Sequence, residues 1–582
     1  MSVKRILAML LTFLLVMSAF TSCQQNTPET PTTPEATTPG ATTPTVTTPT
    51  TPEEIVIPEG AMKLTHVTID AGSTPAEQTA LAELTKYLEK RSITVSDGGL
   101  PISLYLDASL EEDAYCVEAS LKGNNPYMEI RGGNGRGVLY GVYGFLEKYA
   151  GLRSYTPTLE VYPTEGPIII EDGKMIEYHP VFEMRINDWY RWCAGPDTYA
   201  WCVKNGVNMI DGWWEPWDKD TGEWGGAWDY GGLFVHTIGT LTGTGGGTTT
   251  NPCLTDPANL EKAIAAVRAR LESRPSTTIL SVSQNDTDAR CRCANCTAID
   301  REEGSPAGTL LRFVNAIAND IAVDYPNVIV DTLAYDYTQS APKITKPAAN
   351  VCIRLCTFHC CFTHPLTDPD CAANAKFCKD LEDWSEICDN IHIWDYTTNF
   401  AYYIPTYANL HVLQQNMRYF ADNNAHGMFP QGNRNSTSGE FGELRAYLLA
   451  KLMMNPYMTE EEYYAMMDEF LQAYYGEGWA YIRMYIDKTS EMFEPHCGRM
   501  YMHPLERIPA EEFRELQHAF TEWWTRAEEL AGEEQKANVR KSSLQWRFFL
   551  ARFDSSLQPA FQQEVQDLGI FWSEGNQYNA KW

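Results

Sequence analysis

Basic residues are scarce in this sequence. Its 582 residues include 45 Lys and Arg against 76 Asp and Glu, which gives a formal net charge of −31 at pH 7. A surface this acidic repels phosphate backbones, so the composition argues against a nucleic-acid partner.

Long apolar runs are also scarce. The longest run, residues 6–20, spans 15 positions and follows two basic residues, a pattern typical of a targeting signal. A run of this length is shorter than the roughly 20 residues that a membrane-spanning helix needs. Residues 19–23 resemble a bacterial lipobox, which implies cleavage before Cys23 and lipidation of its thiol. Residues 24–54 are rich in Thr and Pro and predict a solvated tether. We therefore expect a protein that a lipid anchors to the extracellular side of a bacterial membrane.

Several catalytic motifs are absent. The sequence has no nucleophile elbow, no phosphate loop and no H-E-x-x-H helix. The glycine-rich stretch 132–137 precedes a predicted helix, but it does not match the dinucleotide fingerprint and predicts a tight turn instead. We expect no cofactor.

Cysteine is plentiful, with 16 residues. Cys291, Cys293 and Cys296 lie close together, and Cys360, Cys361 and Cys371 follow further along the chain. Metal ligation by the first group requires a fourth donor, which the local sequence does not supply. Disulfides or packed thiols are therefore the favoured interpretation, a structural metal is the alternative, and no metal ligand is assigned.

The pattern of apolar residues divides the chain beyond the tether into three regions. Residues 55–178 predict a small α/β domain, with strands at 62–69, 102–106 and 127–131 and helices at 76–90 and 135–149. Residues 457–582 predict a helical C-terminal domain, in which 459–475 and 510–530 are amphipathic.

Between these regions, residues 179–456 alternate short apolar strands with polar tips and helical segments. Eight such strands are the number required for a (β/α)8 TIM barrel. The predicted strands are 182–186, 207–210, 232–237, 278–283, 328–333, 351–355, 391–394 and 427–430.

Chemistry in such a barrel lies at the carboxyl ends of its strands. The polar and aromatic residues at those ends are rich in carboxylates, as glycoside cleavage requires, because one carboxyl donates a proton and another group stabilises or attacks the oxocarbenium centre. Tryptophan in the segment 213–228 suggests stacking on sugar rings. The predicted substrate-binding residues are Arg185, Trp213, His236, Tyr335, Tyr337, His359, Asp395, Tyr396 and Gln431.

Three residues are the candidates for catalysis: Asn285, Asp286 and Glu440. The side chains of neighbouring residues at the end of a strand point in different directions, so Asn285 and Asp286 can contact different groups of a substrate. The competing interpretation is that the Asn-Asp pair only caps a turn. Glu440 has a competing interpretation, because Thr437-Ser-Gly-Glu440 fits a capping box at a helix N-terminus.

Several longer segments carry a resemblance to a known family. These segments are 135–147, 234–237, 281–286 with the three following cysteines, 304–306, 311–315, 391–400 and 439–451 before Asn455-Pro456. Together they look like the domain-of-unknown-function 4838 group, which includes glycoside hydrolase family 163, over residues 60 to about 490.

The resemblance implies a barrel preceded by a hexosaminidase-type α/β domain, and endo-β-N-acetylglucosaminidase activity on N-glycans. Related retaining enzymes use the substrate acetamide as nucleophile beside an acidic pair. By analogy, Asn285 or Asp286 orients the acetamide, and Asp286 or Glu440 is the acid, although this chain has Asn-Asp where those enzymes have Asp-Glu.

Two alternatives stay open. The first is an exo-glycosidase of the α-glucuronidase or hexosaminidase type, for which Arg185 and Arg434 are possible donors to a uronic acid. The second is a surface lipoprotein that binds glycans without cleaving them. The expected partners are a glycan or glycoprotein and, through the lipid anchor only, a membrane.

Overall fold

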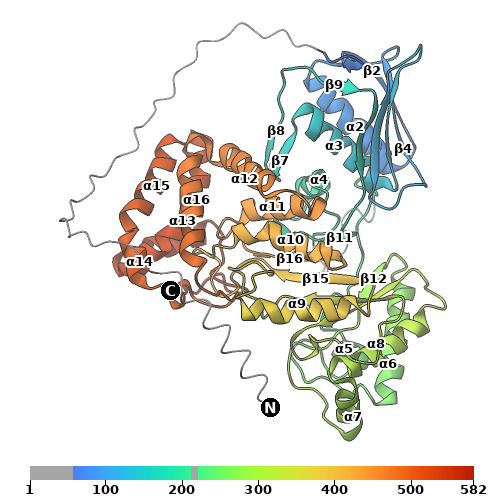
Figure 1. Cartoon of the computed structure of the whole chain (residues 1–582), viewed down its shortest axis with the longest axis vertical. Coiled ribbons are helices and arrows are strands. Elements are labelled where there is room, and N and C mark those ends of the chain that lie inside the picture. Colours follow the sequence, from blue (N-terminus) through green and yellow to red (C-terminus); the bar gives the residue numbers. More distant parts are fainter. Residues whose placement is uncertain (1–56, 211–220) are drawn as a thin grey trace, which may run out of the picture. The chain divides into compact units, whose positions relative to one another are not determined.

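A computed structural model of the chain describes residues 57–210 and 221–582 (Figure 1). The predicted lipobox, the tether and Trp213 lie outside these residues. Within the described part of the chain, no helix combines the length and the apolarity that crossing a bilayer requires.

The first region is an α/β domain built on a six-stranded sheet. Its strand order is β10-β5-β6-β4-β2-β3; β2, β3, β4 and β6 are parallel, and β5 runs antiparallel to both of its neighbours, β6 and β10. Helices α2 and α3 lie on one face of this sheet (Figure 1). The bounds of the elements are β2 His66–Ala71, α2 Pro75–Lys90, β3 Thr94–Val95, β4 Leu100–Leu106, β5 Tyr115–Ser120, β6 Tyr127–Gly132, α3 Gly135–Ala150 and β10 Gly173–Tyr178.

Local sequence explains where the two helices begin. Thr74 and Glu77 form a capping box before α2. Asn134 caps α3 by accepting a hydrogen bond from the Gly137 amide. A Cβ at Gly132 would lie 2.2 Å from the Val138 backbone nitrogen, so the glycine-rich stretch serves close packing of strand against helix. The prediction of a tight turn is confirmed.

Smaller pairs of strands complete this region. β1 Ala61–Lys63 pairs with β9 Ile169–Glu171, and β7 Arg153–Thr156 pairs with β8 Leu159–Val161. The single strand predicted at 62–69 is therefore two strands, β1 and β2, which belong to different sheets.

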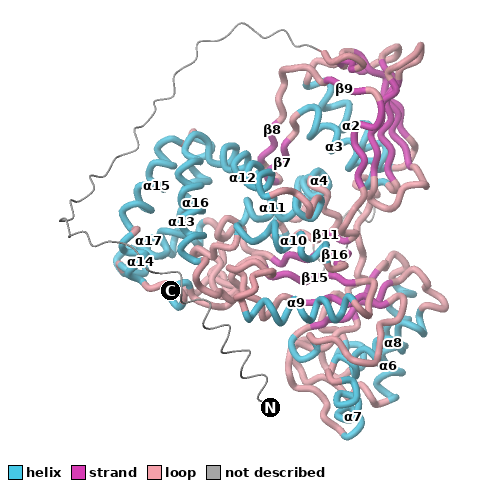
Figure 2. Tube along the Cα trace, viewed as in Figure 1, coloured by secondary structure: helices cyan, strands magenta, loops and turns pink. Residues whose placement is uncertain are grey.

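A second sheet contains six parallel strands in the order β11-β16-β15-β14-β13-β12, and it curls as half of a barrel does. Helices and strands alternate along this part of the chain, as Figure 2 shows by colour. The strands are β11 Met184–Arg185, β12 Ile279–Ser281, β13 Ile329–Ala334, β14 Val351–Cys356, β15 Ile391–Tyr396 and β16 Ala425–Gln431.

The intervening helices follow the predicted periodicity, and several short ones add to them. They are η1 Arg191–Cys193, α4 Pro196–Lys204, α5 Ile238–Thr242, α6 Pro257–Ser273, α7 Ala294–Glu303, α8 Ala307–Ile321, η2 Asp336–Thr338, α9 Ala372–Ser385, η3 Leu410–Val412, α10 Leu413–Asp422 and α11 Gly442–Met454.

Two of the eight predicted barrel strands do not form regular strands. In residues 207–210 only Met209 pairs, through an isolated parallel bridge to Ile186. Residues 232–237 run beside β12, and the Leu233 carbonyl oxygen accepts a hydrogen bond from the Ser281 amide, but Gly232 and His236 have φ angles of 78° and 55°. Positive φ breaks the extended backbone that a strand requires. The prediction of eight regular strands is therefore wrong for the second and third.

The last part of the chain is helical, as predicted, and its end returns to the barrel. The predicted helix 510–530 is interrupted at Leu516 and forms two helices. After the final helix, the Glu574 amide donates to the Phe400 carbonyl oxygen and the Tyr403 amide donates to that of Trp572. The helices are α12 Glu460–Tyr475, η4 Gly476–Gly478, α13 Trp479–Phe493, η5 Pro504–Glu506, α14 Ala510–Glu515, α15 Gln517–Leu530, α16 Glu533–Phe553, η6 Ser555–Leu557 and α17 Gln558–Asp567.

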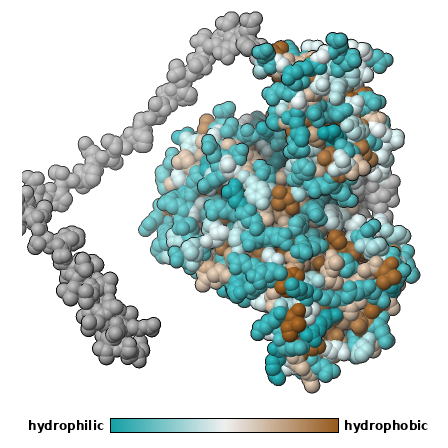
Figure 3. Space-filling view, turned by 45° about the vertical axis from the view of Figure 1, so that its right-hand side comes forward, coloured by the Kyte–Doolittle hydropathy of each residue, from teal (hydrophilic) through white to brown (hydrophobic). Residues whose placement is uncertain are grey.

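The surface agrees with the acidic composition. On the face that Figure 3 shows, hydrophilic residues predominate and apolar residues form small, separated groups. The apolar side chains of all three regions belong to one connected core.

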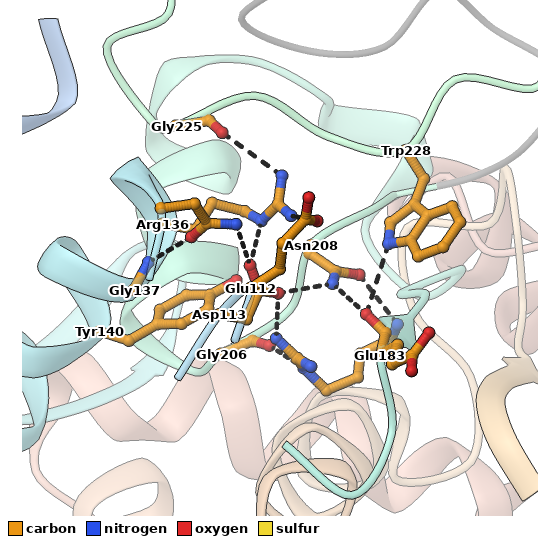
Figure 4. Close-up of polar contacts among 12 residues, drawn as sticks. Glu112, Asp113, Arg136, Gly137, Tyr140, Glu183, Gly206, Asn208, Gly225 and Trp228 are labelled. Carbon is orange, nitrogen blue, oxygen red and sulfur yellow. Dashed lines mark hydrogen bonds and ion pairs between the residues drawn. The ribbon is translucent and has the colours of Figure 1, made fainter. Parts of the chain in front are cut away.

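A buried ionic cluster joins the α/β domain to the start of the barrel (Figure 4). The Asp113 carboxylate accepts hydrogen bonds from Arg136 at 2.7 Å, Arg185 at 2.8 Å and Asn208 at 2.9 Å. Burial alone raises the pKa of Asp113, but the two guanidinium groups and the amide donors outweigh it, so the pKa falls to about 2. Asp113 therefore stays ionised at neutral pH. Its negative charge compensates the two buried guanidinium groups, which would otherwise be buried without a counter-charge.

We expect Asp113→Asn to lower the free energy of unfolding by about 3–5 kcal/mol at pH 7, because it leaves two buried guanidinium groups without their counter-charge. The folded pKa lies below the unfolded one, so this contribution is present above about pH 4 and is lost as pH falls toward 2. Thermal unfolding at pH 7 and pH 3 measures both effects. The exposed Asp97→Asn is the matched control. Equal melting temperatures for the two variants at pH 7 would contradict the role of Asp113.

Candidate active site

A pocket with about 500 Å³ of water-accessible space lies at the carboxyl ends of the parallel strands. This volume is within the range of small-molecule sites. The residues that line it are Arg191, Val235, His236, Asp286, Leu333, Tyr335, Cys356, Phe358, Trp394, Tyr396, Gln431, Arg434, Tyr501 and Glu574.

Asp286 enters the pocket from the loop that follows β12. Its backbone amide donates to the Gly247 carbonyl oxygen, which fixes the loop. One carboxylate oxygen accepts a hydrogen bond of 3.1 Å from the Tyr335 hydroxyl. The side chain is exposed, so it is accessible to a ligand.

Glu574 supplies a second carboxylate from the C-terminal segment. It accepts hydrogen bonds from Arg434 at 2.7 Å and from the Gln431 amide at 3.4 Å. Glu574 is not among the residues predicted from the sequence, because it follows no predicted strand and lies in a segment predicted to be helical.

Tyrosines stand near both carboxylates. Burial, then the negative charges of Glu574 and Asp286, raise the pKa of Tyr501 to about 12, while Arg434 opposes the shift. The Tyr501 hydroxyl is therefore within the electrostatic reach of both acids. Burial and Asp286 likewise raise the pKa of Tyr335. Both hydroxyls stay protonated near neutral pH; that of Tyr335 donates to Asp286, and Tyr501 lines the pocket as a hydrogen-bond donor.

His236 lines the pocket in its neutral form. Its Nδ1 lies 2.8 Å from the Gln284 carbonyl oxygen, and the contact is a hydrogen bond only when Nδ1 carries the proton. Burial lowers the pKa of His236, against the opposing effects of this hydrogen bond and of Asp286. The other ring nitrogen is then an acceptor for a hydroxyl group.

Aromatic rings line part of the pocket, and a buried ion pair lies beneath them. Trp394 and Tyr396 stack with ring centroids 6.3 Å apart, and the Trp394 indole nitrogen donates to Gln431 at 2.8 Å. Beneath them, fully buried Arg354 pairs with Asp331 at 3.1 Å and lies 5.0 Å from the Trp394 ring. These contacts set the rotamers of the side chains that face the pocket.

Five of the twelve predicted site residues line this pocket: His236, Asp286, Tyr335, Tyr396 and Gln431. Trp213 lies outside the described residues. The remaining six lie elsewhere, and their contacts show what each does.

Asn285 and Glu440 are buried and engaged with the protein itself. The Asn285 amide group donates to the carbonyl oxygens of Gly245 and Thr249, and its oxygen accepts from the Gly239 amide. Glu440 is 3% exposed and is ion-paired with Arg445. The predicted capping box at Glu440 is wrong, because α11 begins at Gly442 and its N-cap is Phe441.

The other four contribute to packing or to ion pairs. Arg185 belongs to the Asp113 cluster, and the Tyr337 ring lies 4.7 Å beneath the Arg290 guanidinium. His359 contacts Asp336 at 3.3 Å. Asp395 accepts hydrogen bonds from the Thr357 hydroxyl at 2.8 Å and from the Tyr396 amide at 2.9 Å.

The family described as domain of unknown function DUF4838 matches residues 154–487, more than half of the chain. The chain belongs to this family. The match includes all six strands of the second sheet and Asp286, but it ends before Tyr501 and Glu574. No curated protein matches the sequence.

Several solved structures are similar to this member of the family. A β-N-acetylhexosaminidase from Bacteroides fragilis is 12% identical, covers 72% of this chain and 92% of its own, and has a TM-score of 0.41. A family 20 β-N-acetylhexosaminidase from Streptomyces coelicolor is 12% identical, with 73% and 95% coverage and a TM-score of 0.41. A family 89 glycoside hydrolase from Clostridium perfringens is 11% identical, with 84% and 62% coverage and a TM-score of 0.47. At such identities, substrate and mechanism have to be inferred from this chain's own side chains.

We expect Asp395→Asn to stabilise the protein at pH 8. Burial raises the pKa of Asp395 to about 6 despite its two hydrogen bonds. A carboxyl group whose folded pKa exceeds the unfolded value binds its proton more tightly when folded, so stability falls as pH rises from about 4 through 6. The uncharged amide of the variant does not have to bury a negative charge, so the substitution removes this loss of stability. We expect the gain in the free energy of unfolding to be about 1–3 kcal/mol at pH 8.

Thermal unfolding of Asp395→Asn and of the parent protein at pH 8 and pH 4.5 measures this effect. The gain at pH 8 should exceed the gain at pH 4.5, whereas the exposed Asp389→Asn should show no such difference. An Asp395→Asn variant that is less stable than the parent at pH 8 would contradict the explanation.

Proposed function

We propose that the protein is a glycoside hydrolase whose two catalytic carboxyl groups are Asp286 and Glu574. The observation that carries this proposal is that both carboxylates line one pocket whose walls are tyrosine and tryptophan rings. Sugar hydrolysis requires a pair of carboxyl groups, and aromatic rings offer apolar faces on which sugar rings stack.

The hydrogen bonds around each carboxylate support a division of roles. Arg434 and Gln431 hold Glu574 from one side, which leaves its second oxygen for the anomeric centre. Tyr335 orients Asp286, which is exposed and able to reach a glycosidic oxygen. We therefore propose Asp286 as the proton donor and Glu574 as the group that stabilises or attacks the oxocarbenium centre.

The proposed substrate is a glycan that contains N-acetylglucosamine, as the family resemblance implies. The Asn285 side chain makes its hydrogen bonds to residues 239–249, so it does not serve as the acetamide partner. The protonated hydroxyl of Tyr501 lines the pocket as a donor that suits an acetamide carbonyl, whereas Tyr335 already donates its proton to Asp286. Endo-cleavage of N-glycans is the leading form of this proposal.

A specific observation favours a second candidate, an exo-glycosidase that acts on a uronic acid. Arg191 and Arg434 both line the pocket, and guanidinium groups bind carboxylates in a bidentate manner. Arg185, which the sequence suggested for this role, lies in the Asp113 cluster instead.

We expect Asp286→Asn and Glu574→Gln each to lower kcat by about 10²- to 10⁴-fold, because each removes one half of the carboxyl pair. The assay is release of free glycan from a panel of N-glycoproteins, with aryl N-acetylglucosaminides and glucuronides alongside. Glu564→Gln is a matched control in the same C-terminal region, because Glu564 pairs with Arg547 and does not line the pocket.

Leaving-group dependence separates the two roles. A variant without the proton donor should cleave a dinitrophenyl glycoside nearly as fast as the parent, since that leaving group needs no proton, and should fail on an alkyl glycoside. Tight glycan binding by a parent protein that cleaves no substrate would overturn the enzymatic proposal in favour of a glycan-binding protein. Full activity of Glu574→Gln would overturn the assignment of Glu574.

We also propose that lipidation of Cys23 anchors the protein to the extracellular side of the membrane, on the basis of the lipobox resemblance. Cys23→Ser should abolish incorporation of labelled fatty acid and move the protein from the membrane fraction to the soluble fraction of a bacterial host. Labelled lipid on the Ser variant would contradict the proposal.

A further inference from the structure

Seven of the cysteines gather in two groups outside the pocket. The first consists of Cys253, Cys291, Cys293 and Cys296, and the second of Cys361, Cys371 and Cys497 with His364. In each group all four ligand atoms lie within 4.8 Å of one another. The 15 described cysteines form no disulfide.

The first group has the dimensions of a tetrahedral thiolate site. The Cys253 sulfur lies 3.8 Å from that of Cys293 and 3.7 Å from that of Cys296. A Zn–S bond of about 2.3 Å places two sulfurs of a tetrahedron about 3.8 Å apart. Cys253 is the fourth donor that the local sequence lacked, because it lies 38 positions before Cys291 and reaches it only in the fold.

Neighbouring donors support this group as ligands. The Cys296 amide donates to the Cys293 sulfur at 3.5 Å, and the Thr255 hydroxyl lies 3.4 Å from the Cys296 sulfur. Such hydrogen bonds to sulfur stabilise thiolates at metal centres. Cys293 is exposed, and a thiol packed only for its apolar character would be buried.

The second group has the dimensions of a site with three sulfurs and one nitrogen. The Nδ1 atom of His364 lies 3.6 Å from the sulfurs of both Cys361 and Cys497, and the sulfurs of Cys371 and Cys497 are 3.9 Å apart. Zn–S and Zn–N bonds of about 2.3 and 2.0 Å at a tetrahedral angle place the sulfur and the nitrogen about 3.5 Å apart.

The histidine in this group is oriented as a metal ligand is. Its Nε2 bonds the Glu494 carbonyl oxygen, which requires the proton on Nε2 and leaves the lone pair of Nδ1 directed at the sulfurs. The Gly498 amide donates to the Cys361 sulfur at 3.3 Å.

We propose that these two groups are closed structural sites for zinc, one of four cysteines and one of three cysteines with His364. Tetrahedral sets of four thiolates, or of three thiolates and one imidazole, are the all-protein ligand sets that bind structural zinc. The sequence-based preference for disulfides or packed thiols at Cys291, Cys293 and Cys296 is replaced by this assignment. It does not depend on the proposed reaction.

Each site joins segments that shape the pocket. In the first, Cys253 lies two residues after Asn251, which accepts a hydrogen bond from the Asn285 amide beside Asp286. In the second, Cys361 follows Phe358 after β14, and Cys497 precedes Tyr501, so the metal would tie a barrel loop to the C-terminal region.

Metal analysis of the purified full-length chain tests the proposal. We expect about two zinc ions per chain by mass spectrometry, about one after Cys253→Ser, about one after Cys497→Ser and none after both. Cys193→Ser, outside both groups, should keep about two zinc ions. X-ray absorption at the zinc edge of the parent should show a shell dominated by sulfur at about 2.3 Å.

The parent protein alone also decides the question if a variant fails to fold. Titration with an organomercurial, which displaces zinc from thiolates, should release about two zinc ions per chain, detected with a colorimetric chelator. Metal-free protein with these cysteines mapped as disulfides or free thiols would overturn the proposal. So would a zinc shell of oxygen and nitrogen only, or iron in place of zinc.

Discussion

The parallel pairing of β11 to β16 places the carboxyl ends of six strands at one edge of a curled sheet, and the pocket depends on this constraint. Residues that are remote in sequence, such as Asp286 after β12 and Arg434 after β16, meet only because their strands share a direction. The buried Arg354–Asp331 pair beneath the aromatic floor adds a second requirement, because removing either partner would leave a charge inside the barrel.

Sequence pattern was sufficient to locate most strands of the second sheet and the edge at which the pocket lies. Apolar runs of strand length that end in polar residues carry that information locally, and Asp286, Tyr335 and Gln431 all follow such runs. The regular strands at 207–210 and 232–237 were predicted from the same signal, but positive φ at Gly232 and His236 depends on tertiary contacts that a pattern of apolar residues does not encode.

Side-chain direction explains the residues that were misplaced. Trp394 and Tyr396 face the pocket, so Asp395 between them points to the opposite side and meets Thr357, as the alternation of a strand requires. Glu440 and Asn285 lie close to the rim in sequence, but their hydrogen bonds turn them into the protein. Glu574 and Cys253 were missed for another reason: each completes a group whose other members are distant in the chain, and no local spacing indicates it.

The position of Glu574 has a consequence for biosynthesis. It is separated from Asp286 by 288 positions (574 − 286), and the chain is made from its N-terminus. At about 5–20 residues per second, roughly 15–60 s pass between synthesis of the two carboxyl groups. During that interval the nascent chain has Asp286 and the aromatic rings of the pocket but lacks Glu574. In the function proposed above, the pocket becomes competent for hydrolysis only when the segment around Glu574 pairs with Phe400.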